Sequence, residues 1–236
     1  MGPLAAALLL LLGAAPLAAQ ANRTEAAGPG TASPSSGNCG LDPRLSPDQM
    51  RGMLRAVYDE VFLLSGLPEK PPLLWDAQRS ANFAYAQPSP PKKDMAGDAV
   101  AGPGEIHYNP GLCDALHSLD EVAFVFGHEL GHIGAKDFKR GDDKAAELDA
   151  KCGGRENACF TQAANDFRAM QEKEADAFGL RVIKKDGSRF QANADAAAQA
   201  FMDHLRDLFW AIGAHSSQSP HYAPPSQRAE ELRGAR

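Results

Sequence analysis

The chain has 236 residues, of which 44% are hydrophobic and 23% are charged, and its formal net charge is −6. This length fits one large domain or two small ones, and the composition is ordinary for a globular protein. The lysines and arginines are dispersed, so the basic patch of a nucleic-acid-binding protein is absent. The one long apolar run, residues 4–19, is shorter than the roughly 20 residues that a membrane-spanning helix needs. These features disfavour a nucleic-acid-binding protein, an integral membrane protein and a coiled coil.

Residues 1–21 have the layout of a secretory signal peptide. A centre rich in Leu and Ala precedes Ala19-Gln20-Ala21, which supplies the small residues of a cleavage site. We expect cleavage after Ala21, with a cut after Ala19 as the alternative. We expect export to the periplasm, with secretion and an uncleaved signal anchor as the alternatives. Residues 22–38 are small, polar and rich in Pro and Gly, which predicts a flexible leader. The mature chain is then expected to have no transmembrane segment.

The four cysteines agree with an oxidising compartment. An even number in an exported chain favours disulfides, and the C-x-x-C spacing of a structural zinc site does not occur. We favour a bond between Cys152 and Cys159, which would close a short loop containing glycine. This leaves Cys39 and Cys113 to tie the amino-terminal end to the body. The other pairings and buried free thiols stay as alternatives.

Residues 39–236 are predicted to form a single α+β domain that is mainly helical. Short apolar runs between Pro71 and Pro110 are separated by Pro, Gly and Asp, which indicates a small antiparallel sheet. Apolar residues at helical spacing and capping residues predict helices in the rest of the chain. These helices are expected from Ser46-Pro47 to Gly66, from Ser118 to about Ala135, over 157–185, over 192–212 and in a short segment ending near Leu232.

The segment His128-Glu129-Leu130-Gly131-His132 lies in the helix that follows Ser118. Histidines four residues apart lie on one helix face, one turn apart, so both imidazoles can bind a single Zn²⁺. Zinc lowers the pKa of its water to about 7, and Glu129 beside the first ligand can take the proton as the water attacks a peptide carbonyl. We therefore predict one zinc ion per chain and Glu129 as general base. The alternative is two ordinary histidines beside a solvated glutamate.

A catalytic zinc ion needs a third protein ligand, and Glu172 is the candidate. Glu172, Ala175, Asp176 and Gly179 share one face of the next helix, where the small residues allow another helix to approach closely. We expect Asp176 to accept the free ring N–H of a ligand histidine. Glu174 points to another side and is expected to be solvated. Without the histidine motif, this segment would be interpreted as a charged helix face.

These motifs resemble the zinc metallopeptidases typified by the CAAX prenyl protease and HtpX, specifically their soluble exported bacterial relatives. The resemblance covers residues 97–232 and rests on the strand and Pro-Gly turn of residues 99–108, the H-E-L-G-H helix and the E-x-x-A-D block that begins at Glu172. It implies a zincin-like fold and a zinc endopeptidase with glutamate as the third ligand. It also implies that a strand at the cleft edge pairs with an extended substrate. That strand comprises Glu105, Ile106, His107 and Tyr108.

Two features depart from the pattern of that family. The gap between His132 and Glu172 is shorter than in many members, so a lid element is expected to be reduced. Members carry a His-Pro-Pro-like segment with an arginine six residues after the histidine. Here Arg228 is preceded at that distance by Tyr222, with His221 one residue away. The resemblance implies that one of these two side chains donates to the oxyanion of the tetrahedral intermediate. A surface loop is the alternative.

The sequence thus favours an exported zinc endopeptidase that cleaves unfolded or extended polypeptides in the cell envelope, outer-membrane proteins included. A zinc-holding binding or chaperone module without turnover is one alternative, against which the intact Glu129 argues. A regulatory metallopeptidase of the ImmA/IrrE type is another. Those enzymes are usually cytosolic, so the export signal argues against them.

Overall fold

The computed structural model describes residues 44–76, 84–88, 92–93, 99–100, 104–109, 112, 116–211 and 225–234. The expected signal peptide (1–21), the leader (22–38), Cys39, Cys113, His221 and Tyr222 lie outside these residues. The elements in chain order are α1 (Pro47–Ser65), β1 (Leu73–Trp75), β2 (Ala84–Gln87), β3 (Lys92–Lys93), β4 (Ala99–Val100), β5 (Glu105–Tyr108), α3 (Leu119–Gly134), α4 (Asp137–Cys152), α5 (Ala158–Ile183), a 3₁₀ helix (Gln191–Asn193), α6 (Ala194–Ala211) and α7 (Pro225–Gly234). The mainly helical α+β domain predicted from the sequence is confirmed.

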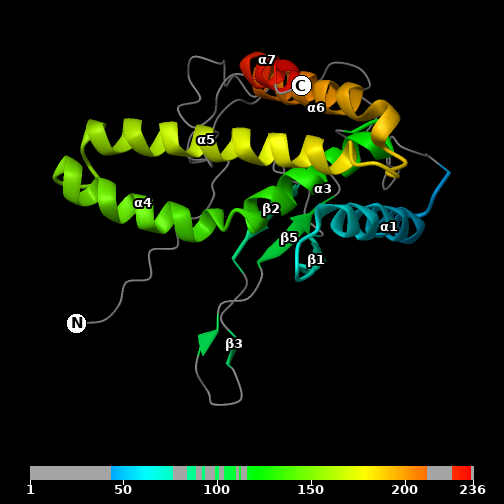
Figure 1. Cartoon of the computed structure of the whole chain (residues 1–236), viewed down its shortest axis with the longest axis horizontal. Coiled ribbons are helices and arrows are strands. Elements are labelled where there is room, and N and C mark those ends of the chain that lie inside the picture. The colour runs from blue at the N-terminus through cyan, green and yellow to red at the C-terminus, as the bar shows by residue number, and fades with distance from the viewer. Residues whose placement is uncertain are drawn as a thin grey trace, which may run out of the picture.

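The long helix α5 crosses the molecule (Figure 1), with α4 beside its first half and with α6 and α7 along its other side. Helix α3 packs against α5, α1, α6 and β2. Every residue of α3 from Glu121 to His132 is buried. A helix that is apolar on nearly all sides is stable only inside a protein, so α3 forms the centre of the fold.

Capping residues fix where α1 and α3 begin, as the sequence predicts. The Ser46 side chain accepts the Gln49 N–H and the Gln49 side chain accepts the Ser46 N–H, which completes a capping box. The Ser118 side chain caps α3 by accepting the Glu121 N–H at 3.1 Å, whereas the Glu121 carboxylate accepts from the Ser118 hydroxyl and the His117 N–H. Helix α1 ends at Gly66, which has a positive φ of 73° that suits glycine.

The three-stranded sheet has the order β1-β5-β2 and is mixed, because β1 runs parallel to β5 and β2 runs antiparallel to it. The expected sheet was wholly antiparallel. The chain reverses between β1 and β2 and reverses again before β5, which restores the direction of β1. Ile106 and Tyr108 of β5 point into the core, where the Tyr108 ring meets Phe126 of α3. Strands β3 and β4 form a separate antiparallel pair.

Helix α4 has no counterpart among the helices predicted from the sequence. It buries only Asp137, Ala145, Leu148 and Cys152, and no side chain caps its first residue. The preceding Lys136 adopts a left-handed conformation (φ 57°) at the junction between α3 and α4. The predicted Cys152–Cys159 disulfide is present and joins the end of α4 to the start of α5.

Within the described part of the chain, no helix combines the length and the apolar character that a membrane crossing requires.

Candidate metal centre

The close approach of α3 and α5 brings the predicted ligands together. A Cβ atom added to Gly127 would lie 2.9 Å from the Cα of Gly179, and one added to Gly179 would lie 2.8 Å from the backbone nitrogen of His128. A Cβ atom added to Gly131 would lie 3.0 Å from the Cα of Ala175. Only glycine permits two helix backbones to come this near. The His128–His132 face of α3 therefore lies directly against the Glu172–Gly179 face of α5.

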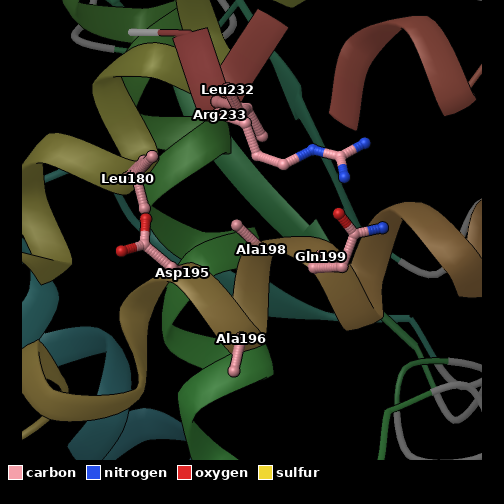
Figure 2. A pocket seen from close by; sticks show the side chains of 7 residues that line it. All are labelled: Leu180, Asp195, Ala196, Ala198, Gln199, Leu232 and Arg233. Atoms are coloured by element: carbon pink, nitrogen blue, oxygen red, sulfur yellow. The ribbon is translucent and has the colours of Figure 1, made fainter. Parts of the chain in front are cut away.

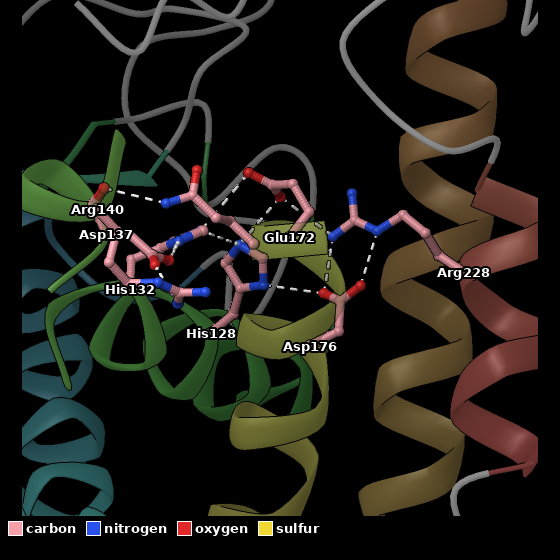
Figure 3. A network of polar contacts seen from close by, with 8 residues as sticks. His128, His132, Asp137, Arg140, Glu172, Asp176 and Arg228 are labelled. Carbon is pink, nitrogen blue, oxygen red and sulfur yellow. Dashed lines mark hydrogen bonds and ion pairs between the residues drawn. The ribbon is translucent and has the colours of Figure 1, made fainter. Parts of the chain in front are cut away.

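His128, His132 and Glu172 converge, with one ligand atom of each within 4.8 Å of the others (Figure 3). The two Nε2 atoms are 3.1 Å apart. The Glu172 carboxylate lies 3.4 Å from the Nε2 of His128 and 3.6 Å from the Nε2 of His132. All three side chains are buried, with at most 8% of any residue exposed. Two imidazole nitrogens and a carboxylate are a common ligand set for a divalent transition-metal ion.

The structure places Asp176, the expected partner of a ligand histidine, against His128. The His128 Nδ1 lies 2.9 Å from Asp176 Oδ1. Arg228 of α7 donates to both oxygens of Asp176 at 2.7 Å, and its Nη2 lies 3.4 Å from Glu172. Burial raises the pKa of Asp176, but the Arg228 charge and the His128 hydrogen bond outweigh it and hold that pKa below its usual value. Asp176 is therefore ionised and accepts the His128 N–H.

Asp137 plays the matching part for His132, and sequence analysis did not identify it. The His132 Nδ1 lies 2.8 Å from Asp137 Oδ2. The other oxygen of Asp137 accepts a hydrogen bond from Arg140 at 2.8 Å, and Arg140 also donates to Glu174 at 2.7 Å. Glu174 lies partly in solvent, as expected, with 46% of its side chain exposed. The turn at Lys136 brings Asp137 back to the histidine, so only the conformation of that turn could have revealed this partner.

These residues fit a bound cation. Each Nδ1 faces a carboxylate and donates its hydrogen to it. In neutral rings the two Nε2 atoms, which are close together, would then each carry a lone pair. A cation placed between them would be bound by both lone pairs. Burial lowers the pKa of His128, but the Asp176 and Glu172 carboxylates outweigh it and raise that pKa to about 10. Burial raises the pKa of Glu172, but the His128 hydrogen bond and the charges of both histidines and Arg228 lower it to about 2. The site is built to hold positive charge beside an ionised Glu172.

Glu129 is buried on the same turn of α3, with 7% of the residue exposed. Its carboxyl accepts a hydrogen bond from the Ala86 backbone N–H of β2. Burial raises the pKa of Glu129, although the positive charges of His128 and His132 and the Ala86 N–H oppose the rise. A carboxyl whose pKa is shifted toward neutrality beside a candidate metal site is suited to exchanging protons.

The expected role of strand β5 is corrected by the sheet order. Glu105, Ile106, His107 and Tyr108 all pair with β2, and the last three also pair with β1. A central strand has no free edge, so β5 cannot add an extended substrate. Among the described strands of this sheet, the edge next to α3 is β2, whose Ala86 contacts Glu129.

Comparison with protein families now identifies the chain. The model of peptidase family M48 matches residues 54–235. The chain belongs to peptidase family M48. The matched range includes all three candidate ligands, Glu129, both aspartates and Arg228, and it confirms the resemblance predicted from the motifs. Searches of curated proteins and of solved structures found no match to the chain.

A pocket of about 310 Å³ lies between α5, α6 and α7 of this M48 peptidase (Figure 2). Leu180, Asp195 and Arg233 are among its lining residues, and none of the predicted site residues lines it. The candidate metal centre is instead the buried junction of α3 and α5.

Proposed function

We propose that the chain is a zinc-dependent endopeptidase that hydrolyses unfolded or extended polypeptides. The observation that carries the proposal is the convergence of His128, His132 and Glu172 beside the buried Glu129, within a chain of a metallopeptidase family. Two nitrogens and one carboxylate oxygen leave a tetrahedral zinc ion one open position, which is the arrangement of catalytic zinc sites.

In this mechanism His128, His132 and Glu172 would hold one zinc ion per chain. The bound ion would lower the pKa of a water molecule and polarise the scissile carbonyl. Glu129 accepts the proton of the attacking water at its carboxylate and then delivers it to the leaving amine. The Ala86 N–H holds one oxygen of Glu129, which fixes the direction of the carboxylate.

The two aspartates keep the ligand rings in the required tautomer. Asp176 and Asp137 each accept an Nδ1 hydrogen, which leaves both Nε2 lone pairs free for the ion. His221 or Tyr222 is proposed as the donor to the oxyanion. Both precede α7, whose Arg228 contacts Glu172 and Asp176.

The edge of β2 that pairs with no other described strand is the proposed binding site for the substrate backbone. In the β2–β5 pairing, Tyr85 and Gln87 lie opposite His107 and Glu105. Backbone groups alternate in direction along a strand, and the Ala86 N–H is turned toward Glu129. A polypeptide added along this edge would run beside Glu129. Such pairing uses backbone groups of the substrate, which explains a preference for unfolded chains.

Cleavage of casein tests this proposal. Zinc-loaded protein should cleave casein, a chelator should abolish the cleavage and added zinc should restore it. The Glu129→Gln variant should retain zinc but lose at least about 10²-fold in rate, the lower end for general-base catalysis. Glu156→Gln, at an exposed loop position, is the matched control and should cleave at the wild-type rate. A zinc-loaded wild type that cleaves no peptide would instead support the non-catalytic binding module.

The proposed location is the periplasm, with secretion as the alternative, and outer-membrane proteins are the proposed substrates. The signal sequence and the Cys152–Cys159 disulfide support export. Alkaline phosphatase fused after residue 45 should be active if this segment is exported, whereas an inactive fusion would contradict export. The match to family M48 sets aside the ImmA/IrrE-type alternative.

A further inference from the structure

A second cluster of polar side chains covers the face of the three-stranded sheet that is turned away from α3. Side chains alternate between the two faces of a strand, so Ile106 and Tyr108 enter the core while Glu105 and His107 point the other way. Tyr85 and Gln87 of β2 lie beside them, and Asp76 follows β1. None of these five side chains takes part in the proposed peptidase mechanism.

His107 is held in a single orientation. Its Nδ1 lies 3.0 Å from Asp76 Oδ1, and the hydroxyl of Tyr85 donates to the other oxygen of Asp76 at 2.9 Å. The Tyr85 ring stacks on the imidazole at a centroid distance of 4.9 Å. Burial and the hydrogen bond to Asp76 raise the pKa of Tyr85 to about 12, so its hydroxyl keeps the hydrogen that it donates. Asp76 therefore accepts the Nδ1 hydrogen of His107, and the remaining lone pair of the imidazole lies on Nε2, 2.7 Å from the amide nitrogen of Gln87.

That Nε2 faces two further polar groups. The amide nitrogen of Gln87 lies 2.7 Å from it and donates to Glu105 Oε2 at 3.2 Å, and Glu105 Oε2 lies 3.4 Å from the imidazole nitrogen. A half-turn of the amide exchanges Nε2 and Oε1, so Gln87 can present an oxygen at the same place. Ligands on a tetrahedral ion with bonds of about 2.1 Å are about 3.4 Å apart. The three side chains are thus spaced like the candidate ligands at the α3–α5 junction.

Charge and accessibility also suit a cation at this place. The cluster contains two carboxylates, Asp76 and Glu105, and among the described residues no lysine or arginine forms an ion pair with either. The exposed fractions of the His107 and Glu105 side chains are 13% and 16%, so both groups are partly desolvated but reachable from solvent. A cation would be attracted more strongly here than at a fully solvated carboxylate.

We propose that His107, Glu105 and Gln87 form a second divalent-cation site, with Asp76 fixing the imidazole. One imidazole with two oxygen ligands suits a transition-metal ion such as Zn²⁺ rather than Mg²⁺ or Ca²⁺, which are bound mainly through oxygen. Water would complete the coordination. The site shares no residue with the proposed catalytic centre, so it goes beyond the proposed function and does not depend on it.

The number of zinc ions bound by the untagged chain tests this proposal. Metal-free protein is titrated with Zn²⁺ in a calorimeter, and bound metal is measured after gel filtration. The wild type should bind two equivalents, and His107→Gln and Glu105→Gln should each bind one. Asp76→Asn should lower the affinity for the second zinc equivalent by roughly 10- to 100-fold, as substitutions of residues that hydrogen-bond to metal ligands usually do. Leu74→Ala, at the position opposite His107 on the same sheet face, is the control and should bind two.

The outcomes separate this site from the catalytic one. If the wild type binds only the equivalent that Glu172→Gln removes, the second site does not exist and the proposed function stands. If the only equivalent is removed by His107→Gln, the catalytic assignment fails and the second site stands. A second equivalent that survives both His107→Gln and Glu105→Gln would also overturn the proposal. Circular dichroism of each variant shows that it is folded when metal is counted.

Discussion

Each candidate ligand histidine lies at the end of an arginine–aspartate–histidine chain. One chain runs from Arg228 through Asp176 to His128, and the other from Arg140 through Asp137 to His132. In each chain the arginine donates a charge-assisted hydrogen bond to the aspartate, and the aspartate accepts one from Nδ1 of the histidine. The chains differ in exposure, because 4% of the Arg228 side chain is accessible and 33% of that of Arg140. The charges of Arg228 and Asp176 are therefore less screened by solvent than the charge of Arg140.

Asp137→Asn tests the second chain at the scale of one residue. The amide can still accept the His132 N–H, but it lacks the charge that makes the imidazole a stronger ligand. We expect zinc affinity to fall by roughly tenfold, the lower end of the range for such partners. Competition with a chelator of known affinity measures the change. Asp142→Asn, at an exposed position of the same helix, should bind zinc as the wild type does; equal losses in both variants would contradict the assigned contact.

Glu129→Gln should stabilise the metal-free protein at neutral pH. The pKa of Glu129 is raised in the folded state, so folding favours its protonated form. That contribution is complete below the unfolded pKa and is lost as the pH rises through the folded pKa. A neutral glutamine avoids this loss, so we expect the variant to be more stable than the wild type at pH 8 and the difference to disappear in acid. Urea denaturation over this pH range measures it, and a pH-independent difference would count against the explanation.

At the scale of the elements, the crossing of α3 and α5 determines where the ligands meet. In Gly127→Ala the new Cβ would meet the backbone of Gly179, which has no flexible end to move. We expect a loss of about 1–3 kcal/mol and weaker zinc binding, because the helices must separate. The α4 substitution Gly141→Ala meets nothing within 4 Å and should instead stabilise the protein by about 0.5–1 kcal/mol. Thermal denaturation compares the two, and the same sign in both would refute the close-packing argument.

Elements with local signals were predictable, whereas those set by distant partners were not. Ser46 and Ser118 begin their helices through side-chain caps, and apolar spacing continues them. Helix α4 begins without a side-chain cap, and the apolar residues of its buried stripe are only Ala145, Leu148 and Cys152. The helical spacing was therefore present in its sequence but had few large apolar residues to mark it. The strands of the mixed sheet are three or four residues long, too short to reveal that β1 lies parallel to β5. The edge role given to β5 was wrong for this reason.

The same distinction explains the candidate site. His128 and His132 lie one helical turn apart, so the local sequence is enough to pair them. The Glu172–Asp176 face could be recognised from its own spacing once that pair was known. Asp137 could not, because its contact depends on the left-handed turn at Lys136. The contact of Ala86 with Glu129 depends on how β2 packs against α3, which no local pattern contains.

At the scale of the whole molecule, the candidate centre is assembled from parts of the chain that are far apart. It includes β2, α3, the start of α4, α5 and the last helix, α7. Helix α7 lies beside α6 and α5 near the carboxyl end of the chain (Figure 1). Arg228, the residue of α7 that reaches the centre, is buried together with Ala229 and Leu232. Docking of the last helix and the charge balance of the centre are therefore coupled.

Arg228→Gln tests this coupling, because it leaves Asp176 buried with less compensating charge. We expect the metal-free variant to lose about 3 kcal/mol at pH 7, as when one partner is removed from a buried ion pair. The folded pKa of Asp176 is lowered, so its contribution is present above the unfolded pKa and is lost as the pH falls through the folded pKa. The difference between the variant and the wild type should therefore shrink in acid.

Arg233→Gln is the matched control on the same helix, since Arg233 is exposed and, among the described residues, its guanidinium donates a hydrogen bond only to the Ala229 carbonyl. This variant should stay within about 0.5 kcal/mol of the wild type, as surface substitutions usually do. Urea denaturation of both variants from pH 7 to pH 3 gives the comparison. Two outcomes would contradict the coupling: an Arg228→Gln variant that is no less stable than Arg233→Gln, or a loss of stability that does not change with pH. In either case Arg228 would not compensate the charge of Asp176, and α7 would contribute to the fold only by packing.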